Sequence, residues 1–373
     1  MTPAVLVKLL ARLRTATGRR FPAPARLCAP QPGSRGKQVN LALQGGGAHG
    51  AFTWGVLDQL LLDGRIEIDG ISGASAGAVN AVMLADGLAR GGPEEARKRL
   101  AEFWRAVSVE SRLPQLQRAV ADRLFPFVPR DALWLGAMSR FVSPYDLNPL
   151  NINPLKELIE RFVDFNAIRH SDRELFISAT NVHTGEARIF DRAEVNAEAV
   201  MASACLPLLF RAVEIDGESY WDGGYSGNPA LIPILSATTT EDVLIVQINP
   251  RFRRQTPTHT RAIVSRINEI NFNASLLSEL RAVTFVNRLI DEGRLPRGLQ
   301  QGEFRRLKLH RVVMEEMGET AGTPSTLSTD FQSFEKLHKL GQRATRRFLD
   351  AHFGEIGRRG TIDLAVEAMP ELV

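Results

Sequence analysis

The chain has little of what stabilises small secreted proteins or anchors membrane proteins. It contains only two cysteines among 373 residues, Cys28 and Cys205, so we expect no structural disulfide and a reducing, cytoplasmic compartment. No apolar run approaches the roughly 18 residues of a membrane-spanning helix. Metal-ligand spacings and acidic calcium loops are also missing, so we expect no metal and no other cofactor. The sequence shows no internal repeat and no low-complexity tract.

Acidic residues are absent from the first part of the chain. Residues 1–57 contain eight basic residues and no acidic one, while residues 58–373 contain 38 basic and 42 acidic residues, a net charge of −4. Apolar residues at helical spacing in the basic segment suit an interfacial helix on an anionic membrane, an arginine-rich targeting peptide, or an extension without a role. These residues are Val5, Leu6, Leu9, Leu10 and Leu13. Four prolines between residues 21 and 36 indicate a linker.

Glycine, by contrast, is concentrated in two turns that lie one helix apart. The first is GGGAHG at Gly45–Gly50, and the second is GASAG at Gly73–Gly77. Each follows a short apolar run typical of a buried parallel strand, and each precedes apolar residues at helical spacing. The predicted order is therefore strand, glycine loop, helix, strand, sharp turn and helix.

The second turn places Ser75 between two glycines. In a Gly-x-Ser-x-Gly elbow the serine sits on a strained turn from strand to helix, and the flanking Gly73 and Gly77 avoid collisions with neighbouring backbone. The serine hydroxyl would project above the sheet edge at a helix N-terminus, where unpaired N–H groups favour a developing oxyanion. This pattern predicts a nucleophilic serine.

The first turn offers what such a serine requires nearby. Three consecutive glycines, Gly45, Gly46 and Gly47, expose backbone N–H groups that can stabilise a tetrahedral oxyanion. One helical crossover separates this loop from Ser75, so adjacent parallel strands would bring the two loops side by side. The loop also fits the dinucleotide fingerprint GxGxxG, ending at Gly50, which would indicate a nucleotide-binding regulatory protein. That interpretation needs an acid at the end of the second strand, where the serine stands instead.

The seven histidines do not offer an obvious base for the serine, since none lies in a setting typical of a hydrolase triad. Asp222 is the better candidate, because with Gly223 and Gly224 it forms a tight Asp-Gly-Gly turn after the strand-like residues 218–221. A plain Asx turn is the structural alternative. An aspartate with an ordinary pKa near 4 is a poor base, so we expect burial to raise its basicity.

In this order, GGGAHG, GASAG and DGG resemble the three signatures of the patatin-like phospholipase family, which uses a Ser–Asp dyad without histidine, as cytosolic phospholipase A2 does. The resemblance covers about residues 39–250. It implies a three-layer α/β/α sandwich with a mostly parallel central sheet, Ser75 as the nucleophile, Asp222 as the general base and the backbone of Gly45–Gly47 as the oxyanion hole. Family members commonly carry arginine where this chain has His49, which affects side-chain charge at the loop but not its backbone donors.

The implied activity is hydrolysis of acyl esters of phospholipids or related lipids through an acyl-enzyme. A serine thioesterase or a short-chain carboxylesterase would use the same residues, and a lipid-binding scaffold would keep the fold without turnover. We expect a lipid substrate, membrane contact through residues 1–36 and no nucleic acid. The expected division is a basic, proline-rich extension at 1–36, a catalytic domain with C-terminal helices at 37–355 and a tail at 356–373.

Further elements follow from the apolar pattern. Residues 174–182 and 186–190 predict a hairpin, and 243–249 predict a buried strand followed by arginines that would face an anionic head group or solvent. Residues 261–290 and 331–348 predict two long helices packed on the core. The irregular segment 108–145 would serve as an acyl-binding lid or as ordinary core contact.

The basic extension leads to a first prediction. Because attraction between basic residues and an anionic surface is about 1 kcal/mol each at best and is screened by salt, deletion of residues 1–36 should weaken vesicle binding in a salt-sensitive way. Turnover of a soluble monomeric ester should stay near normal. Sedimentation of the truncated protein with anionic vesicles as fully as the whole chain would contradict this role.

Overall fold

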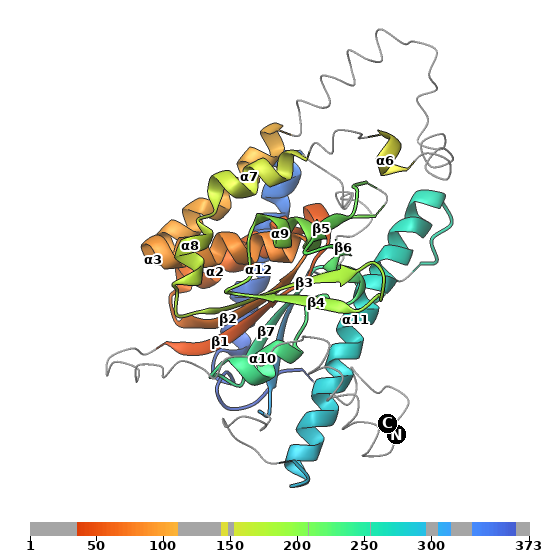
Figure 1. The fold of residues 1–373 in the computed structure, drawn as a ribbon. Helices are drawn as coiled ribbons and strands as arrows, with labels where there is room; N and C mark the ends of the chain where they lie inside the picture. Colours follow the sequence, from red (N-terminus) through yellow and green to blue (C-terminus); the bar gives the residue numbers. More distant parts are fainter. Residues whose placement is uncertain are drawn as a thin grey trace.

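The computed structural model describes residues 36–110, 143–147, 153–207, 209–253, 255–295, 305–314 and 330–362. An eight-stranded sheet with helices on both faces forms this described part (Figure 1). Followed from one hydrogen-bonded neighbour to the next, the strands form the series β5-β6-β3-β2-β1-β7-β8, with β4 also paired to β3. They are β1 (Lys37–Leu43), β2 (Ile66–Ala74), β3 (Glu174–Asn181), β4 (Ala187–Asp191), β5 (Val213–Ile215), β6 (Glu218–Asp222), β7 (Asp242–Gln247) and β8 (Lys308–Val313).

Five of these strands, β3, β2, β1, β7 and β8, pair in parallel, while β4, β5 and β6 join through antiparallel pairs. The expected α/β sandwich with a mostly parallel sheet is therefore confirmed, and so is the expected hairpin, which is β3 with β4. The described helices are η1 (Gly47–His49), α2 (Gly50–Asp63), α3 (Ala76–Glu110), α6 (Pro144–Leu147), α7 (Pro154–Phe162), α8 (Phe165–Arg169), α9 (Ala197–Ser203), η2 (Gly223–Tyr225), α10 (Ile232–Ala237), α11 (Thr260–Asp291) and α12 (Phe331–His352).

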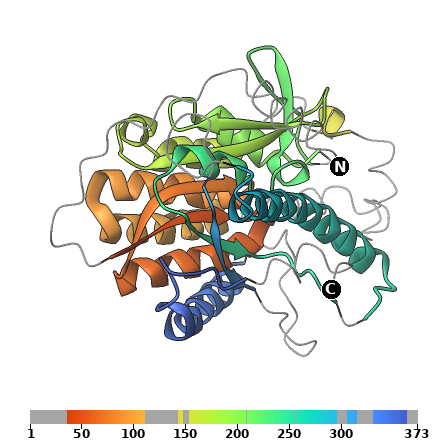
Figure 2. The same ribbon diagram turned by 90° about the horizontal axis from the view of Figure 1, so that it is seen from below.

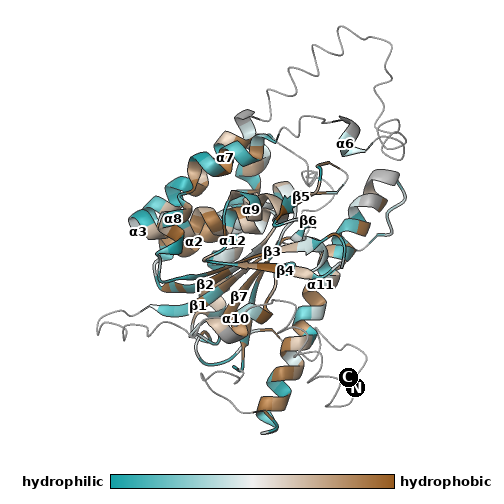
Figure 3. Cartoon of the chain, viewed as in Figure 1, coloured by the Kyte–Doolittle hydropathy of each residue, from teal (hydrophilic) through white to brown (hydrophobic). Residues whose placement is uncertain are grey.

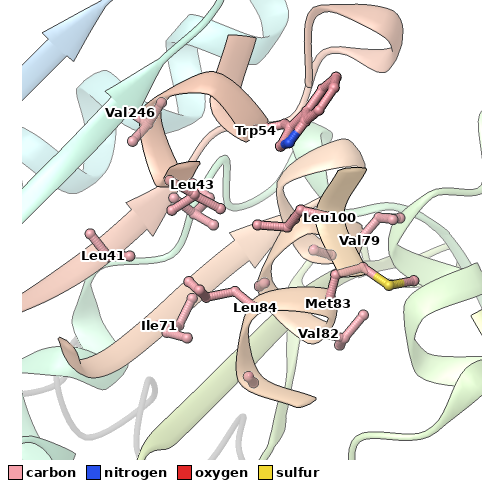
Figure 4. Close-up of a cluster of buried hydrophobic side chains, with 14 of the residues drawn as sticks. Leu41, Leu43, Trp54, Ile71, Val79, Val82, Met83, Leu84, Leu100 and Val246 are labelled. Carbon is pink, nitrogen blue, oxygen red and sulfur yellow. The ribbon is translucent and has the colours of Figure 1, made fainter. Parts of the chain in front are cut away.

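The apolar side chains of the central strands divide between two cores, because successive residues of a strand point to opposite faces. Leu41 and Leu43 of β1 join the larger core with helices α2, α3 and α12 (Figure 4). Ala42, between them, joins the smaller core with α10 and α11 on the other face. Burial on both faces explains the near-continuous apolar run of the strand.

Helix α12 confirms the predicted core-packing helix at 331–348. Its Phe334 and Leu337 are buried in the larger core. The backbones of α12 and α2 lie in close contact. A Cβ atom at Gly55 would collide with the carbonyl of His338, and one at Gly341 would collide with the carbonyl of Phe52. Glycine at both positions allows this close approach.

Helix α11 departs from its prediction in one half. Leu276, Leu280 and Val283 of the C-terminal half are buried in the smaller core, as expected. Ile263, Ile267 and Ile270 of the N-terminal half are exposed. The expectation that the whole apolar stripe packs on the core is therefore wrong for the first half of the helix.

The C-terminal boundary also needs correction. The backbone N–H groups of Thr361 and Ile362 both donate to the carbonyl of Leu309 in β8, and Ile356 is buried in the larger core. Residues 356–362 thus pack on the sheet, so we propose that the catalytic domain extends at least to residue 362. The expected extension before residue 36 and most of the expected lid at 108–145 lie outside the described residues. Among the described helices, none combines the length and apolarity needed to cross a membrane.

Candidate active site

Two strands meet the same edge of β3 and bring Ser75 and Asp222 together. On that edge, β2 pairs with β3 up to Ala74 opposite Ser178, and β6 pairs from Asp222 opposite Ala179. The other edge of β3 is occupied by β4 over the same residues. The residue that follows β2 and the last residue of β6 therefore become neighbours although 147 positions separate them in the sequence.

Ser75 occupies the strained position that the elbow pattern predicts. Its φ angle is 52°, in the left-handed region that non-glycine residues seldom adopt. The elbow is packed tightly, because a Cβ atom at Gly73 would lie 2.6 Å from the carbonyl oxygen of Gly77, and one at Gly77 would collide with that of Leu43. The Ser75 N–H donates to Ser203 Oγ at 2.9 Å, which fixes the backbone of the turn.

The Ser75 hydroxyl donates a hydrogen bond of 2.6 Å to Oδ2 of Asp222. The Asp222 side chain is fully buried, and its Oδ1 accepts the N–H of Gly224 at 2.7 Å. Burial raises the pKa of Asp222 to about 7, and the hydrogen bonds from Ser75 and Gly224 only partly oppose this rise. The structure thus gives Asp222 the raised basicity that the sequence predicts it would need.

Small side chains of β3 hold the Asp-Gly-Gly turn in place. Thr180 Oγ1 donates to the carbonyl of Asp222 at 2.8 Å, and Ser178 Oγ donates to that of Gly227 at 2.7 Å. A Cβ atom at Gly223 would collide with the carbonyl oxygen of Ser178, so glycine is required there.

The first glycine loop lies directly against the serine, as predicted. A Cβ atom at Gly45 would stand 2.6 Å from that of Ser75. The Gly45 N–H donates to Asn228 Oδ1 at 2.6 Å, and the Gly45 carbonyl accepts Asn249 Nδ2 at 2.6 Å. The occupied N–H contradicts the expected use of Gly45 as an oxyanion donor.

The remaining two glycines keep that expectation open. The first hydrogen bond of η1 runs from the His49 N–H to the Gly46 carbonyl. The N–H groups of Gly46 and Gly47 come before this bond, and N–H groups at the start of a helix have no acceptor within that helix. Gly47 has φ 57°, a conformation that glycine adopts without strain. Gly50, the last glycine of the motif, leaves no room for a side chain, because its Cβ atom would lie 2.8 Å from that of Ala76.

A buried amide network supports the loop from below. Gln44 Oε1 accepts the N–H groups of Ile248 and Asn249 at 2.8 and 2.9 Å, and Gln44 Nε2 donates to Asn273 Oδ1 of α11 at 3.2 Å. The contacts of Asn228, Asn249 and Ser203 were not predicted from the sequence. An Asn-Pro pair after the Asp-Gly-Gly turn and an asparagine at the end of an apolar strand are signals that could have indicated the first two.

Several histidines have partners elsewhere in the fold. His310 is fully buried, with Nε2 2.9 Å from Asp242 Oδ1, and Asp242 is the first residue of β7, at the opposite end of that strand from the glycine loop. His338 lies 3.2 Å from Asp58 between α12 and α2.

The thiol of Cys205 is buried. Burial, together with the nearby charge of Asp222, raises the pKa of this thiol to about 12, which makes Cys205 a poor nucleophile.

Within the part of the chain that the structure describes, no group of three or more His, Cys, Asp or Glu side chains is arranged to hold a metal ion. The described residues thus bring together the predicted serine, the predicted aspartate and the glycine loop. The arrangement can support nucleophilic attack by the serine with the aspartate as proton acceptor.

Comparison with protein-family models gives one match, the family described as patatin-like phospholipase, over residues 41–237. No curated protein matches the chain. Among solved structures, VipD from Legionella pneumophila is similar at 15% identity, with a TM-score of 0.38, over 85% of this chain and 67% of that one. ExoU in the ExoU–SpcU complex from the type III secretion system of Pseudomonas aeruginosa is similar at 15% identity, with a TM-score of 0.34, over 87% of this chain and 53% of that one.

The raised pKa of Asp222 leads to a prediction about stability. An acid whose pKa is about 7 in the folded protein and near 3.8 when unfolded contributes its stability at low pH and loses it as pH rises through about 7. Asp222→Asn, which can bond both Ser75 and Gly224, should therefore raise the free energy of unfolding by about 3 kcal/mol at pH 8 and by little at pH 4.5. Urea unfolding at the two pH values measures this difference.

Asp242→Asn is the matched control, because it is also a buried carboxyl. Although burial opposes it, the hydrogen bonds from His310 and Gly357 lower the pKa of Asp242. This variant should destabilise the protein at pH 8. Equal destabilisation by both variants would contradict the raised pKa of Asp222.

Proposed function

The chain belongs to the patatin-like phospholipase family, and we propose that it is a serine hydrolase of lipid acyl esters with Ser75 as the nucleophile and Asp222 as the general base. Family membership supports a lipid hydrolase. The observation that carries the assignment of residues is the 2.6 Å hydrogen bond from the Ser75 hydroxyl to the fully buried Asp222 carboxylate.

In the proposed acylation, the carboxylate of Asp222 removes the hydroxyl proton while Ser75 Oγ attacks the acyl carbonyl carbon. Collapse of the tetrahedral intermediate breaks the bond to the alcohol oxygen, and Asp222 returns the proton to this leaving group. A water molecule then attacks the acyl-enzyme with the same base, releasing the fatty acid. A base with a pKa near 7 suits both directions of proton transfer at neutral pH.

The oxyanion of each intermediate would be stabilised by the backbone N–H groups of Gly46 and Gly47. These groups lie at the start of η1, in the loop whose first glycine contacts Ser75. Helix α3 begins at Ala76, directly after the serine, so its N-terminal end adds a favourable field. Each well-placed donor contributes about 3 to 4 kcal/mol to such a transition state.

The proposed substrates are phospholipids or related lipids with a carboxylic ester bond, met by peripheral contact with a membrane. The test of the proposal is reaction with a fluorophosphonate, followed by mass spectrometry and a panel of lipids. A fluorophosphonate forms a covalent bond with an activated serine and leaves ordinary serines unmodified. Labelling of Ser203, which lies beside Ser75, in place of Ser75 itself would overturn the assignment.

The two proposed catalytic residues should act as one unit. Ser75→Ala should lower kcat by about 10³-fold or more, and Asp222→Asn by about 10²- to 10⁴-fold, with both folds intact. The double variant should be no slower than the slower single variant, since nucleophile and base serve the same step. Near-normal turnover by Asp222→Asn on a soluble ester would refute the dyad.

The pH dependence of activity is a separate prediction. Because only the carboxylate form of Asp222 accepts the proton, kcat/KM for a soluble ester should rise with pH and level off above an inflection near 7. An ordinary aspartate would place this inflection near 4. A profile that is already flat at pH 5 would show that Asp222 is not the base or is not desolvated.

A further inference from the structure

The N-terminal half of α11 carries an apolar face that the protein leaves exposed. Ile263, Ile267 and Ile270 are 40%, 50% and 52% exposed, and their spacing of four and three residues places them on one side of the helix. Both ribbon views show this end of α11 projecting beyond the sheet, and brown segments mark its apolar residues (Figures 2 and 3). Phe252, in the loop that leads from β7 to α11, is 78% exposed.

The side of α11 that is turned away from these isoleucines adjoins the candidate active site. Phe272, the next large apolar residue of α11 after Ile270, packs edge-on against Tyr225 with ring centres 5.6 Å apart. Ser275 Oγ donates to the carbonyl of Gly224 at 3.2 Å, so α11 is fixed to the turn that holds Asp222. Tyr225 is itself 39% exposed. The three isoleucines lie within about three helical turns of Phe272 and extend along the opposite side of the helix for about 10 Å.

The charge of the same segment is strongly positive. Residues 250–273 contain five arginines and a single acidic residue, Glu269, a net charge of +4. Glu269 is buried and binds both Arg253 and Arg266. The rest of residues 58–373 contains 33 basic and 41 acidic residues, a net charge of −8. Positive charge is thus concentrated in the segment that contains the exposed isoleucines, while the rest of residues 58–373 is acidic.

We propose that the N-terminal half of α11, with Phe252, is the surface through which the protein adsorbs to anionic lipid bilayers. This inference rests on the proposed function and adds to it the kind of lipid aggregate from which the substrate is taken. The isoleucines and Phe252 enter the acyl boundary, and the arginines lie at the level of the anionic head groups. The acidic body is repelled by the same surface, which turns the N-terminal half of α11 toward the membrane.

Charge favours a membrane over the other occupants of such a face. A second copy of the chain would bring two segments of charge +4 together. The chain's own N-terminal extension, residues 1–36, has seven basic residues and no acidic one, so it would also meet like charge. An anionic bilayer complements both the apolar side chains and the arginines.

The test compares Ile267→Asp/Ile270→Asp with Leu62→Asp in the full-length chain. Leu62 is 50% exposed, as Ile267 is. It lies at the end of α2, just before the first residue of β2, and therefore at the opposite end of that strand from Ser75. Binding is measured by sedimentation with vesicles of phosphatidylcholine and phosphatidylglycerol in equal parts. The double variant should raise the apparent Kd at least about tenfold, and Leu62→Asp by less than about twofold.

Turnover of a soluble monomeric ester checks folding in the same samples. Both variants should keep it within about twofold of the unaltered chain, while hydrolysis of vesicle lipid falls only in the isoleucine variant. Phe252→Asp, which lies in a loop and cannot disturb the helix, should weaken vesicle binding in the same direction. High salt, or vesicles of phosphatidylcholine alone, should reduce binding of the unaltered chain.

Vesicle binding by the isoleucine variant equal to that of the unaltered chain would overturn the proposal. So would a change from dimer to monomer in that variant without loss of vesicle binding, because a second copy would then be the occupant. If deletion of residues 1–36 alone abolished binding and both isoleucine and Phe252 variants bound normally, the extension would be the membrane contact. Sedimentation needs no turnover, so a chain that binds through α11 but hydrolyses no ester would refute the proposed function and not this surface.

Discussion

The pairing register of β3 is the constraint on which the candidate site depends. One edge of this strand is shared by β2, which ends opposite Ser178, and by β6, which ends at Asp222 opposite Ala179. A slip of one residue moves a strand by about 3.3 Å and turns each side chain to the other face, which would separate the serine from the carboxylate. The side chains of Ser178 and Thr180, bonded to carbonyls of the Asp-Gly-Gly turn, hold the register at this point.

Within this frame the raised pKa of Asp222 comes from burial. A carboxylate without solvent is destabilised in its charged form, and two hydrogen bonds recover only part of the lost solvation. The strained φ of Ser75 adds to the cost. The large core beneath the site offsets both terms, since strand and helix side chains there are almost fully buried. Destabilised groups held by a rigid scaffold are typical of functional sites.

Local patterns predicted much of this arrangement. The two glycine turns, the elbow serine and the Asp-Gly-Gly turn each have a conformational signature within a few residues, and the alternation of strands and helices follows from apolar periodicity. The role of Gly45 could not be predicted in the same way, because the partner of its N–H, Asn228, is 183 positions away. The packing of residues 356–362 on β8 is likewise a long-range contact without a local signal.

Helix α11 shows a second limit of sequence patterns. Apolar periodicity predicts that one face of a helix avoids water, but it does not say whether protein or lipid covers that face. Here the apolar residues of the C-terminal half face the core, whereas the three isoleucines of the N-terminal half lie on the opposite side of the helix and are exposed. Net charge adds information that periodicity lacks, because residues 250–273, which include the exposed half, carry a net charge of +4.

The same helix also joins the two loops of the candidate site. Asn273 accepts hydrogen bonds from Gln44, before the glycine loop, and from Gln247 at the end of β7, while Ser275 bonds the turn after Asp222. A helix of 32 residues is about 48 Å long, and its C-terminal half is fixed in the core. Its projecting half therefore continues, as one rigid helix, from the residues that bond the two loops of the candidate site. A surface that this half contacts is held at a defined distance and angle from Ser75. If α11 contacts a bilayer as proposed, this positioning would favour transfer of an acyl chain to Ser75 while Asp222 stays out of contact with water, and the raised pKa of Asp222 depends on that exclusion.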